Sequence, residues 1–175
     1  MRGASMRFAA AVILLLALTS QAQMVDMVVV DYEGHGAKYL FANHTGVYMV
    51  GSNGRSNLAF KTTSISSIAV APSLYSDLPT IVFSNSTGIY RAGMYRKALP
   101  VDGPCNNCPW EWKIGDPGLI KKTTSVSAVT VGQKGYNHES NIYFTNSTGM
   151  YSLSGVWDYA KHLIVYGEPK LFCAG

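Results

Sequence analysis

Charged residues are scarce in this chain, and long hydrophobic runs are absent beyond its N-terminus. Only 14% of the 175 residues are charged, and the formal net charge is +4. Proteins that bind nucleic acid or anionic membranes through electrostatics carry much denser positive charge. Long amphipathic helical patterns are lacking as well, which argues against an all-α fold. We therefore expect neither a nucleic-acid partner nor an all-α architecture.

Residue patterns typical of catalysis and metal binding are also lacking. The four histidines show no metal-ligand spacing, and the chain contains neither a Gly-x-Ser-x-Gly nucleophile elbow nor a phosphate-binding loop. The ten acidic residues are scattered. A glycosidase needs two carboxylates at a set separation in space, and nothing in the sequence favours such a pair. We expect a protein that is not an enzyme and that holds no cofactor or metal.

The single long apolar run lies at the N-terminus and is typical of an export signal. Two arginines fall within Met1–Arg7, an apolar run covers Phe8–Leu18, and small residues precede an expected cleavage after Ala22. This layout matches a secretory signal peptide, and the run is too short to serve as a stable bilayer anchor. We expect residues 1–22 to be removed, which leaves a secreted, extracellular domain of residues 23–175 without a membrane anchor.

The chain has three cysteines, an odd number. In an oxidising compartment cysteines usually form disulfides, so one thiol stays free or pairs between chains. Cys105 and Cys108 have CxxC spacing, but they lie in a Pro- and Gly-rich loop rather than at the start of a helix. Two arrangements remain open: a bond between Cys105 and Cys108, and a bond from either of them to Cys173. Zinc is not expected, because no second CxxC or paired His follows.

What the sequence does contain is an internal repeat. Three segments share an apolar strand, a polar turn that ends in Gly, and a second strand that carries a Tyr: Tyr39–Tyr48, Thr80–Tyr90 and Asn141–Tyr151. The second and third copies match without a gap from Lys61 to Tyr90, at a constant offset of 61 residues. We therefore expect the repeat to be the unit of the fold.

Each unit is predicted to form four antiparallel strands, because apolar and polar residues alternate in short segments between turn residues. In the first strand, Val28–Val30 is aligned with Ile68–Val70. The second and third strands form the hairpin, where Gly permits a positive φ in a short turn. An insertion between Ala92 and Gly118 lengthens the second unit. The candidates for the fourth strand are Asn57–Phe60, Trp110–Ile114 and His162–Tyr166. The units cover approximately residues 26–60, 61–120 and 121–175.

The order of residues within these units resembles a β-propeller blade. In chain order the segments are Trp112–Gly115, Leu119–Ile120, Ser125–Gly132, Ile142–Tyr143 and Gly149–Tyr151. This order is similar to tectonin-type blades, and blades of the sortilin and BNR-repeat kind are similar too. The Asp-box of BNR repeats is absent, and Trp112 is the one clear tryptophan at the start of a unit. The resemblance implies an all-β fold of three tandem four-stranded repeats packed as propeller-like blades.

Three blades are too few to close a propeller, since known rings contain about four to eight. One solution is a homo-oligomer in which two chains form a six-bladed ring. The alternative fold is a β-trefoil, which also uses three four-stranded units but closes within one chain. An open array of three blades would leave sheet edges that invite pairing with another chain.

Each repeated turn contains an Asn-x-Thr sequence, the acceptor for N-glycosylation in secreted proteins. The acceptors are Asn43, Asn85 and Asn146. Asn, Thr and Gly also favour turns for conformational reasons, and both interpretations can hold together. Because the turns are equivalent, glycans would gather on one face. The aromatic residues beside the turns are expected to pack in the core or across strands: Phe41, Phe83, Phe144, Tyr48, Tyr90 and Tyr151.

The opposite face is predicted to gather other aromatic side chains. The candidate ligand-binding residues are Tyr32, Tyr75, Trp110 and Tyr136. Aromatic rings next to polar groups bind sugars through stacking and hydrogen bonds, although Tyr75 and Tyr136 also fit a role in loop packing. These features predict a secreted, non-enzymatic recognition module, lectin-like, with glycans or extracellular matrix components as partners. The alternative is a structural component of an extracellular matrix, coat or secretion.

Overall fold

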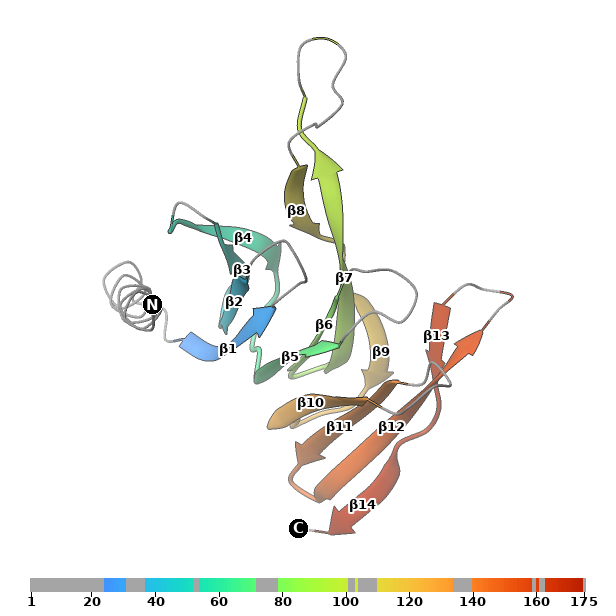
Figure 1. Ribbon diagram of the computed structural model, residues 1–175. Helices are drawn as coiled ribbons and strands as arrows, with labels where there is room; N and C mark the ends of the chain where they lie inside the picture. The colour runs from blue at the N-terminus through green and yellow to red at the C-terminus, as the bar shows by residue number, and fades with distance from the viewer. Residues whose placement is uncertain are drawn as a thin grey trace, which may run out of the picture.

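The computed structural model describes residues 24–30, 37–51, 54–71, 79–100, 103, 110–133, 140–158, 160 and 163–174. The expected signal peptide, residues 1–22, lies outside these ranges. Every regular element within them is a β-strand, so the fold is all-β, as predicted. The strands form three antiparallel sheets that follow one another along the chain (Figure 1).

The first sheet has four strands in chain order. They are β1 (Met24–Val30), β2 (Lys38–Asn43), β3 (Gly46–Val50) and β4 (Ser56–Lys61). Each strand pairs with the next one along the chain, which is the topology of a propeller blade. A β-trefoil would pair strands of different units in one barrel, whereas the described strands pair only within their own sheet.

The second and third sheets repeat this topology with five strands each. The second contains β5 (Ser67–Ala71), β6 (Thr80–Asn85), β7 (Gly88–Ala98), β8 (Trp110–Ile114) and β9 (Gly118–Lys122). The third contains β10 (Ala128–Gln133), β11 (Ser140–Asn146), β12 (Gly149–Asp158), β13 (Leu163–Tyr166) and β14 (Lys170–Ala174). The third strands, β7 and β12, are long enough to pair with two later strands in succession.

The position of the fourth strand was predicted incompletely in the second and third units. Trp110–Ile114 forms β8, and β13 falls within the other predicted segment, but neither matches β4. The strands equivalent to β4 are β9 and β14. Their shared pairing shows this, because a Leu of the fourth strand lies opposite the Tyr of the third in each sheet: Leu58 and Tyr48, Leu119 and Tyr90, Leu171 and Tyr151. The inserted residues therefore extend the third strand outward before the chain returns to complete the blade.

The predicted alignment of the first strands of the first and second units is wrong by one residue. Met27 pairs with Phe41 as Ile68 pairs with Phe83. Met27–Val29, and not Val28–Val30, therefore corresponds to Ile68–Val70. The reason is that the connection from the first to the second strand is one residue shorter in the first unit.

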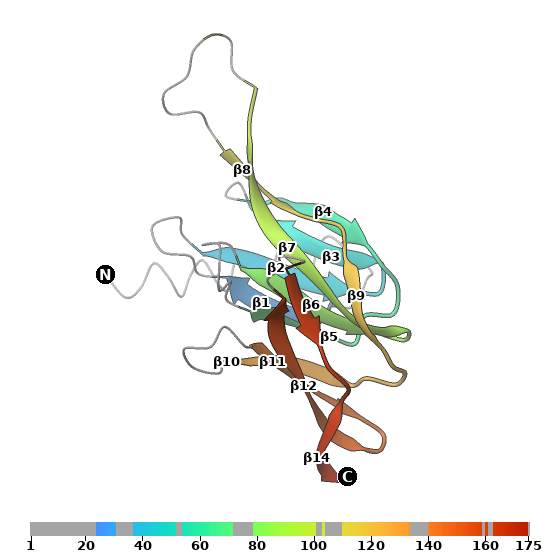
Figure 2. The ribbon, with the colours of Figure 1, turned by 90° about the vertical axis from the view of Figure 1, so that its right-hand side faces the viewer.

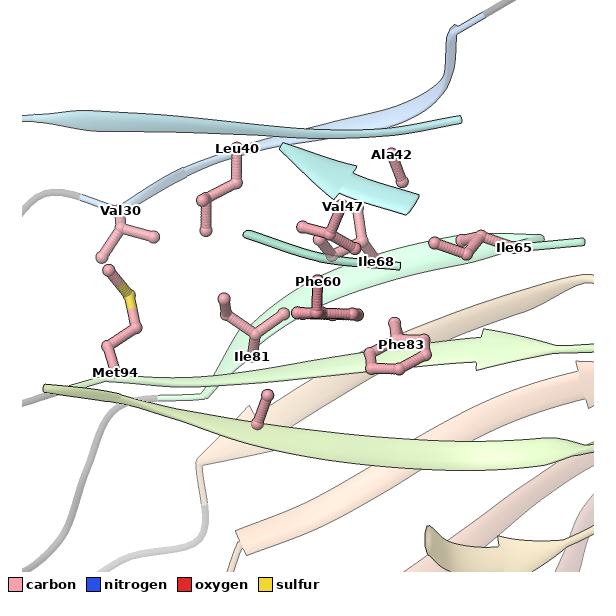
Figure 3. Packing of buried hydrophobic residues seen from close by; sticks show 11 residues of the cluster. Val30, Leu40, Ala42, Val47, Phe60, Ile65, Ile68, Ile81, Phe83 and Met94 are labelled. Carbon is pink, nitrogen blue, oxygen red and sulfur yellow. The ribbon is translucent and has the colours of Figure 1, made fainter. Parts of the chain in front are cut away.

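The second sheet lies between the other two and buries both of its faces (Figure 2). Successive residues of a strand point to opposite faces, so neighbours in sequence join different core clusters. Ile68 and Phe83 pack toward the first sheet, whereas Ala69 and Val82 pack toward the third. Figure 3 shows side chains of the first sheet meeting those of the second, and the rings of Phe60 and Phe83 lie 5.0 Å apart. Burial of these apolar faces is the main force that holds the sheets together.

The first strands of the three sheets, β1, β5 and β10, lie side by side, as the innermost strands of propeller blades do (Figure 1). Asp26 of β1 links two of them, since its Oδ2 accepts hydrogen bonds from the Ser67 hydroxyl at 3.0 Å and the Ile68 N–H at 2.9 Å. The Ser67 hydroxyl also lies 3.4 Å from the carbonyl oxygen of Val129 in β10. Hydrogen bonds to a carboxylate are stronger than those between neutral groups, so Asp26 stabilises the contact between the first two sheets.

Candidate binding site

The three repeated turns share one conformation, which the Asn side chain organises. In each turn the Asn Oδ1 accepts hydrogen bonds from the N–H and the hydroxyl of the Thr two residues later. In the first two turns the same oxygen also accepts the N–H of the following Gly, at 3.1 Å. The Asn-x-Thr-Gly sequence therefore satisfies the backbone donors of a tight hairpin.

A second set of contacts ties each turn to the strands beside it. The Thr hydroxyl shares a hydrogen bond with the hydroxyl of a Tyr three residues later: Tyr48 at 2.8 Å, Tyr90 at 2.7 Å and Tyr151 at 2.7 Å. Each Tyr ring stacks on the Phe opposite it, with ring centroids 5.0 to 5.3 Å apart. The packing role predicted for these aromatic residues is confirmed.

The glycine of each turn is required mainly by the close approach of the neighbouring strand. A Cβ added at Gly46 or Gly88 would lie 2.5 Å from the carbonyl oxygen of Phe60 or Lys121. At Gly149 a Cβ would collide with the carbonyl oxygen of Cys173, and the φ of Gly149 is 147°. A positive φ, which glycine permits and which the turn sequence suggested for all three copies, occurs only in the third turn.

The three predicted glycosylation acceptors differ in accessibility. Asn43 and Asn85 are only 3% and 8% exposed, and the Nδ2 of Asn85 donates to the Thr62 hydroxyl at 3.3 Å. Asn146 is less buried in the equivalent turn. Because a glycan attaches to Nδ2, Asn146 is the most accessible acceptor of the three in this fold. Glycosylation itself stays a prediction.

Of the four candidate ligand-binding residues, Trp110 lies within the described part of the chain. It begins β8, and its side chain is 58% exposed. The other three candidates lie outside the described residues: Tyr32, Tyr75 and Tyr136. The same holds for Cys105 and Cys108. Cys173 is an exposed free thiol whose Sγ donates to the carbonyl oxygen of Ala174 at 3.4 Å.

Trp110 lies in a β-ribbon, formed by β7 and β8, that projects from the second sheet (Figure 1). We call this ribbon the β7–β8 arm; it consists of Met94–Ala98 paired with Trp110–Ile114. Residues directly opposite each other in antiparallel strands share a face. One face of the arm therefore carries three pairs: Met94 with Ile114, Arg96 with Trp112, and Ala98 with Trp110.

This face runs from the core to solvent. At its inner end Met94 is buried in the cluster between the first and second sheets, and Trp112 and Ile114 pack against that cluster. In the middle, the Arg96 guanidinium lies 5.5 Å from the ring centroid of Trp112, a cation–π contact. At the outer end, Trp110 lies opposite the small side chain of Ala98. The exposed indole of Trp110 thus shares a strand face with the Arg96–Trp112 pair, on a ribbon anchored in the core.

The other face of the arm is different in character. Tyr95 pairs with Lys113 and Lys97 pairs with Glu111 across the strands, and Lys113 and Glu111 form an exposed ion pair at 3.0 Å. Such surface pairs contribute little to stability. The arm therefore has an aromatic face and a charged face.

Trp112, which shares this strand face with Trp110, was not identified as a site residue from the sequence. Arg96 and Trp112 come together only through the register of two strands separated by the insertion. An aromatic residue every second position, at Trp110 and Trp112, was the one signal that they share a strand face.

The described residues contain no group of three or more His, Cys, Asp or Glu placed to hold a metal ion. The same residues contain no helix that is long and apolar enough to cross a membrane.

These features define the class of the protein: an all-β repeat protein of three blade-like sheets with a projecting aromatic arm. No protein-family model matches the chain, and a search of curated proteins finds no match either. The resemblance to tectonin-type and BNR-type blades therefore stays a prediction, and the function is inferred from the geometry of the chain itself.

Proposed function

We propose that this protein is a secreted, non-enzymatic recognition module that binds glycans in the manner of a lectin. The observation that carries the proposal is the exposed indole of Trp110 beside the stacked Arg96 and Trp112 on one face of the β7–β8 arm. Secretion, which the N-terminal segment predicts, would place the arm where glycans are abundant.

The chemistry of this face suits a sugar ring. The C–H groups on one side of a pyranose pack well against an indole ring, and the surrounding hydroxyls need hydrogen-bond donors and acceptors at the rim. Arg96 supplies a rigid planar donor group on the same face as Trp110, because it lies two positions along the strand from Ala98, the residue opposite Trp110. A guanidinium also pairs with carboxylates, so acidic saccharides fit this face best.

Anchoring in the core favours binding, because less conformational entropy is lost when the site is already rigid. The inner end of the arm packs on the cluster between the first and second sheets. The Arg96 side chain is held against Trp112.

The proposal is tested by measuring glycan binding on an array and then by titration in solution. Substitution Trp110→Ala should weaken binding of the best saccharide by about fivefold or more, since loss of one aromatic stacking contact costs about 1 kcal/mol. Tyr95→Ala is the matched control, because Tyr95 is an exposed aromatic residue on the other face of the same arm. Equal loss in both variants, or no saccharide binding by the unaltered protein, would contradict the proposal.

The alternative, a structural component of an extracellular matrix, coat or secretion, is favoured by a different observation. Large hydrophobic side chains are exposed on the two end sheets, with Val29 on the first and Phe172 on the third. Insolubility in the native secretion together with an absence of saccharide binding would support this role in place of the lectin.

A further inference from the structure

Each of the two end sheets has a face that packs against no other described sheet. In the first sheet this outer face consists of Met27, Val29, Tyr39, Phe41, Tyr48 and Val50. In the third sheet the outer face includes Thr130, Gly132, Tyr143, Met150 and Phe172. We call these surfaces the first-sheet outer face and the third-sheet outer face.

The repeat identifies what kind of surface the first-sheet outer face is. The strand registers align its six residues with Ile68, Val70, Ile81, Phe83, Tyr90 and Ala92 of the second sheet, and with Val129, Val131, Ile142, Phe144, Tyr151 and Leu153 of the third. All twelve of these equivalents pack in the two core clusters between sheets. The first-sheet outer face is equally apolar: Phe41 and Val50 are each 7% exposed, whereas Val29 is 50% exposed. A solvated sheet face normally carries polar side chains, so this one has the composition of an interface.

The third-sheet outer face shows the complementary pattern. Tyr143 is equivalent to Leu40 and Val82, and Met150 to Val47 and Ile89; all four equivalents are 0% exposed. Phe172 is also on this face. Its equivalents in the other two sheets, Ala59 and Ile120, pack against the core clusters. Phe172 itself is 69% exposed and touches the ring of Tyr143 edge-on.

We propose that the first-sheet outer face of one copy packs against the third-sheet outer face of a second copy. Within the chain, faces equivalent to these two already pack against each other. The equivalent of the third-sheet outer face on the first sheet meets the equivalent of the first-sheet outer face on the second sheet, and the same kind of contact recurs between the second and third sheets. The contact between copies continues this established mode of packing. Two such contacts related by a twofold axis close a ring of six sheets, which lies within the range of about four to eight blades that propellers use.

The same equivalence places individual residues opposite each other across the new contact. Between the second and third sheets, Val131 of β10 packs against the core cluster that contains Ala69 and Ala71 of β5. Val29 corresponds to Val131, and Thr130 and Gly132 correspond to Ala69 and Ala71. Val29 of one copy therefore lies beside Thr130 and Gly132 of the other, where small side chains allow the innermost strands to approach.

The experiment measures the mass of the mature protein by light scattering and by sedimentation. The expected mass is that of two chains. Val29→Lys and Thr130→Glu each place an unpaired charge in the contact, which is strongly unfavourable, so each variant alone should have the mass of one chain. Both positions are exposed in the single chain, and circular dichroism should show that both variants keep the β-sheet fold.

An equimolar mixture of the two variants should regain the mass of two chains. In the mixed dimer the introduced ammonium group meets the introduced carboxylate at one contact, and the other contact has its natural residues. Leu119→Lys is the matched control: Leu119 is 53% exposed, but it belongs to the middle sheet, so the dimer should persist.

Four outcomes would overturn the proposal. Natural protein with the mass of one chain would mean that another segment or partner covers the first-sheet outer face. Thr130→Glu that keeps the dimer while Val29→Lys loses it would mean that two first-sheet faces pair with each other. Open-ended larger species would show that the contact does not close a ring, and a mixture that stays at the mass of one chain would show that Val29 and Thr130 are not neighbours.

Discussion

Asn85 satisfies three donors at once at the scale of a single residue. Its Oδ1 accepts the N–H of Thr87 at 2.9 Å, the Thr87 hydroxyl at 2.8 Å and the N–H of Gly88 at 3.1 Å. Asn85 is 8% exposed and the bond that it accepts from the N–H of Gly88 is buried, so water cannot replace that bond. The equivalent Asn43 makes the same three bonds. The role of this residue in the fold thus stands independently of any glycan.

Substitution Asn85→Ala should therefore destabilise the protein even when it carries no glycan. Loss of the acceptor leaves buried backbone donors unsatisfied, and we expect the free energy of unfolding to fall by about 2–3 kcal/mol. Urea denaturation of protein made in a host that does not glycosylate it measures this change. Ser86→Ala is the control, since Ser86 is exposed in the same turn and its loss leaves the Asn-x-Thr acceptor intact. Equal stability of the two variants would contradict the structural role of Asn85.

Two glycines of β7 should respond in opposite ways to the same substitution. A Cβ at Gly88 meets the Lys121 carbonyl oxygen of β9 at 2.5 Å, whereas a Cβ at Gly93 meets nothing within 4 Å. Gly88→Ala must displace β9, and we expect a loss of about 1–3 kcal/mol in the free energy of unfolding. Gly93→Ala should be neutral or stabilise by about 0.4–1 kcal/mol, because alanine restricts the unfolded chain. Urea denaturation of both variants checks the difference, and a neutral Gly88→Ala would show that β9 is not held against β7.

At the scale of elements, the hairpins were predictable and the returning strands were not. Each hairpin is local: its strands alternate, and its turn contains the Asn and Gly that the geometry requires. The strands β9 and β14 are short and largely exposed, so they carry no clear alternation of apolar and polar residues. Their place in the sheet depends on pairing with β7 and β12 across insertions, which local patterns do not encode.

The candidate site divides in the same way. Trp110 was selected from the sequence as an aromatic residue in the insertion, and it is 58% exposed. Its neighbour Arg96 is brought close by the register of β7 and β8, a long-range property. The cation–π pair of Arg96 with Trp112 therefore had no sequence signal strong enough to assign it to a site. Single residues with suitable side chains could be selected from the sequence, whereas their arrangement in space could be known only from the structure.

At the scale of the whole molecule, the order of the sheets determines how stability is distributed. The middle sheet packs against another sheet on both faces, and each end sheet does so on one. In repeat proteins of this kind, stability is approximately a sum of the units and of the interfaces between neighbours. A further interface between copies would add to this sum only when the protein is concentrated enough to associate.

Substitutions at equivalent positions of the middle sheet and an end sheet should therefore lower stability in different ways: one effect should be the same at every protein concentration, and the other should depend on it. Ile89 is 0% exposed between the second and third sheets, and Met150 occupies the same position on the third-sheet outer face. Ile89→Ala should lower the free energy of unfolding by about 2–5 kcal/mol at every concentration, because it leaves a cavity in the core. Met150→Ala should lower the thermal midpoint only where the natural protein is dimeric.

Calorimetry over a range of protein concentrations measures both effects. The midpoint of the natural protein should rise with concentration, since association stabilises only the folded state. That rise should disappear in Val29→Lys, which cannot form the contact, and in this background Met150→Ala should have little further effect. A midpoint that is independent of concentration, or a Met150→Ala loss as large in dilute as in concentrated protein, would show that the third-sheet outer face is already complete in the single chain.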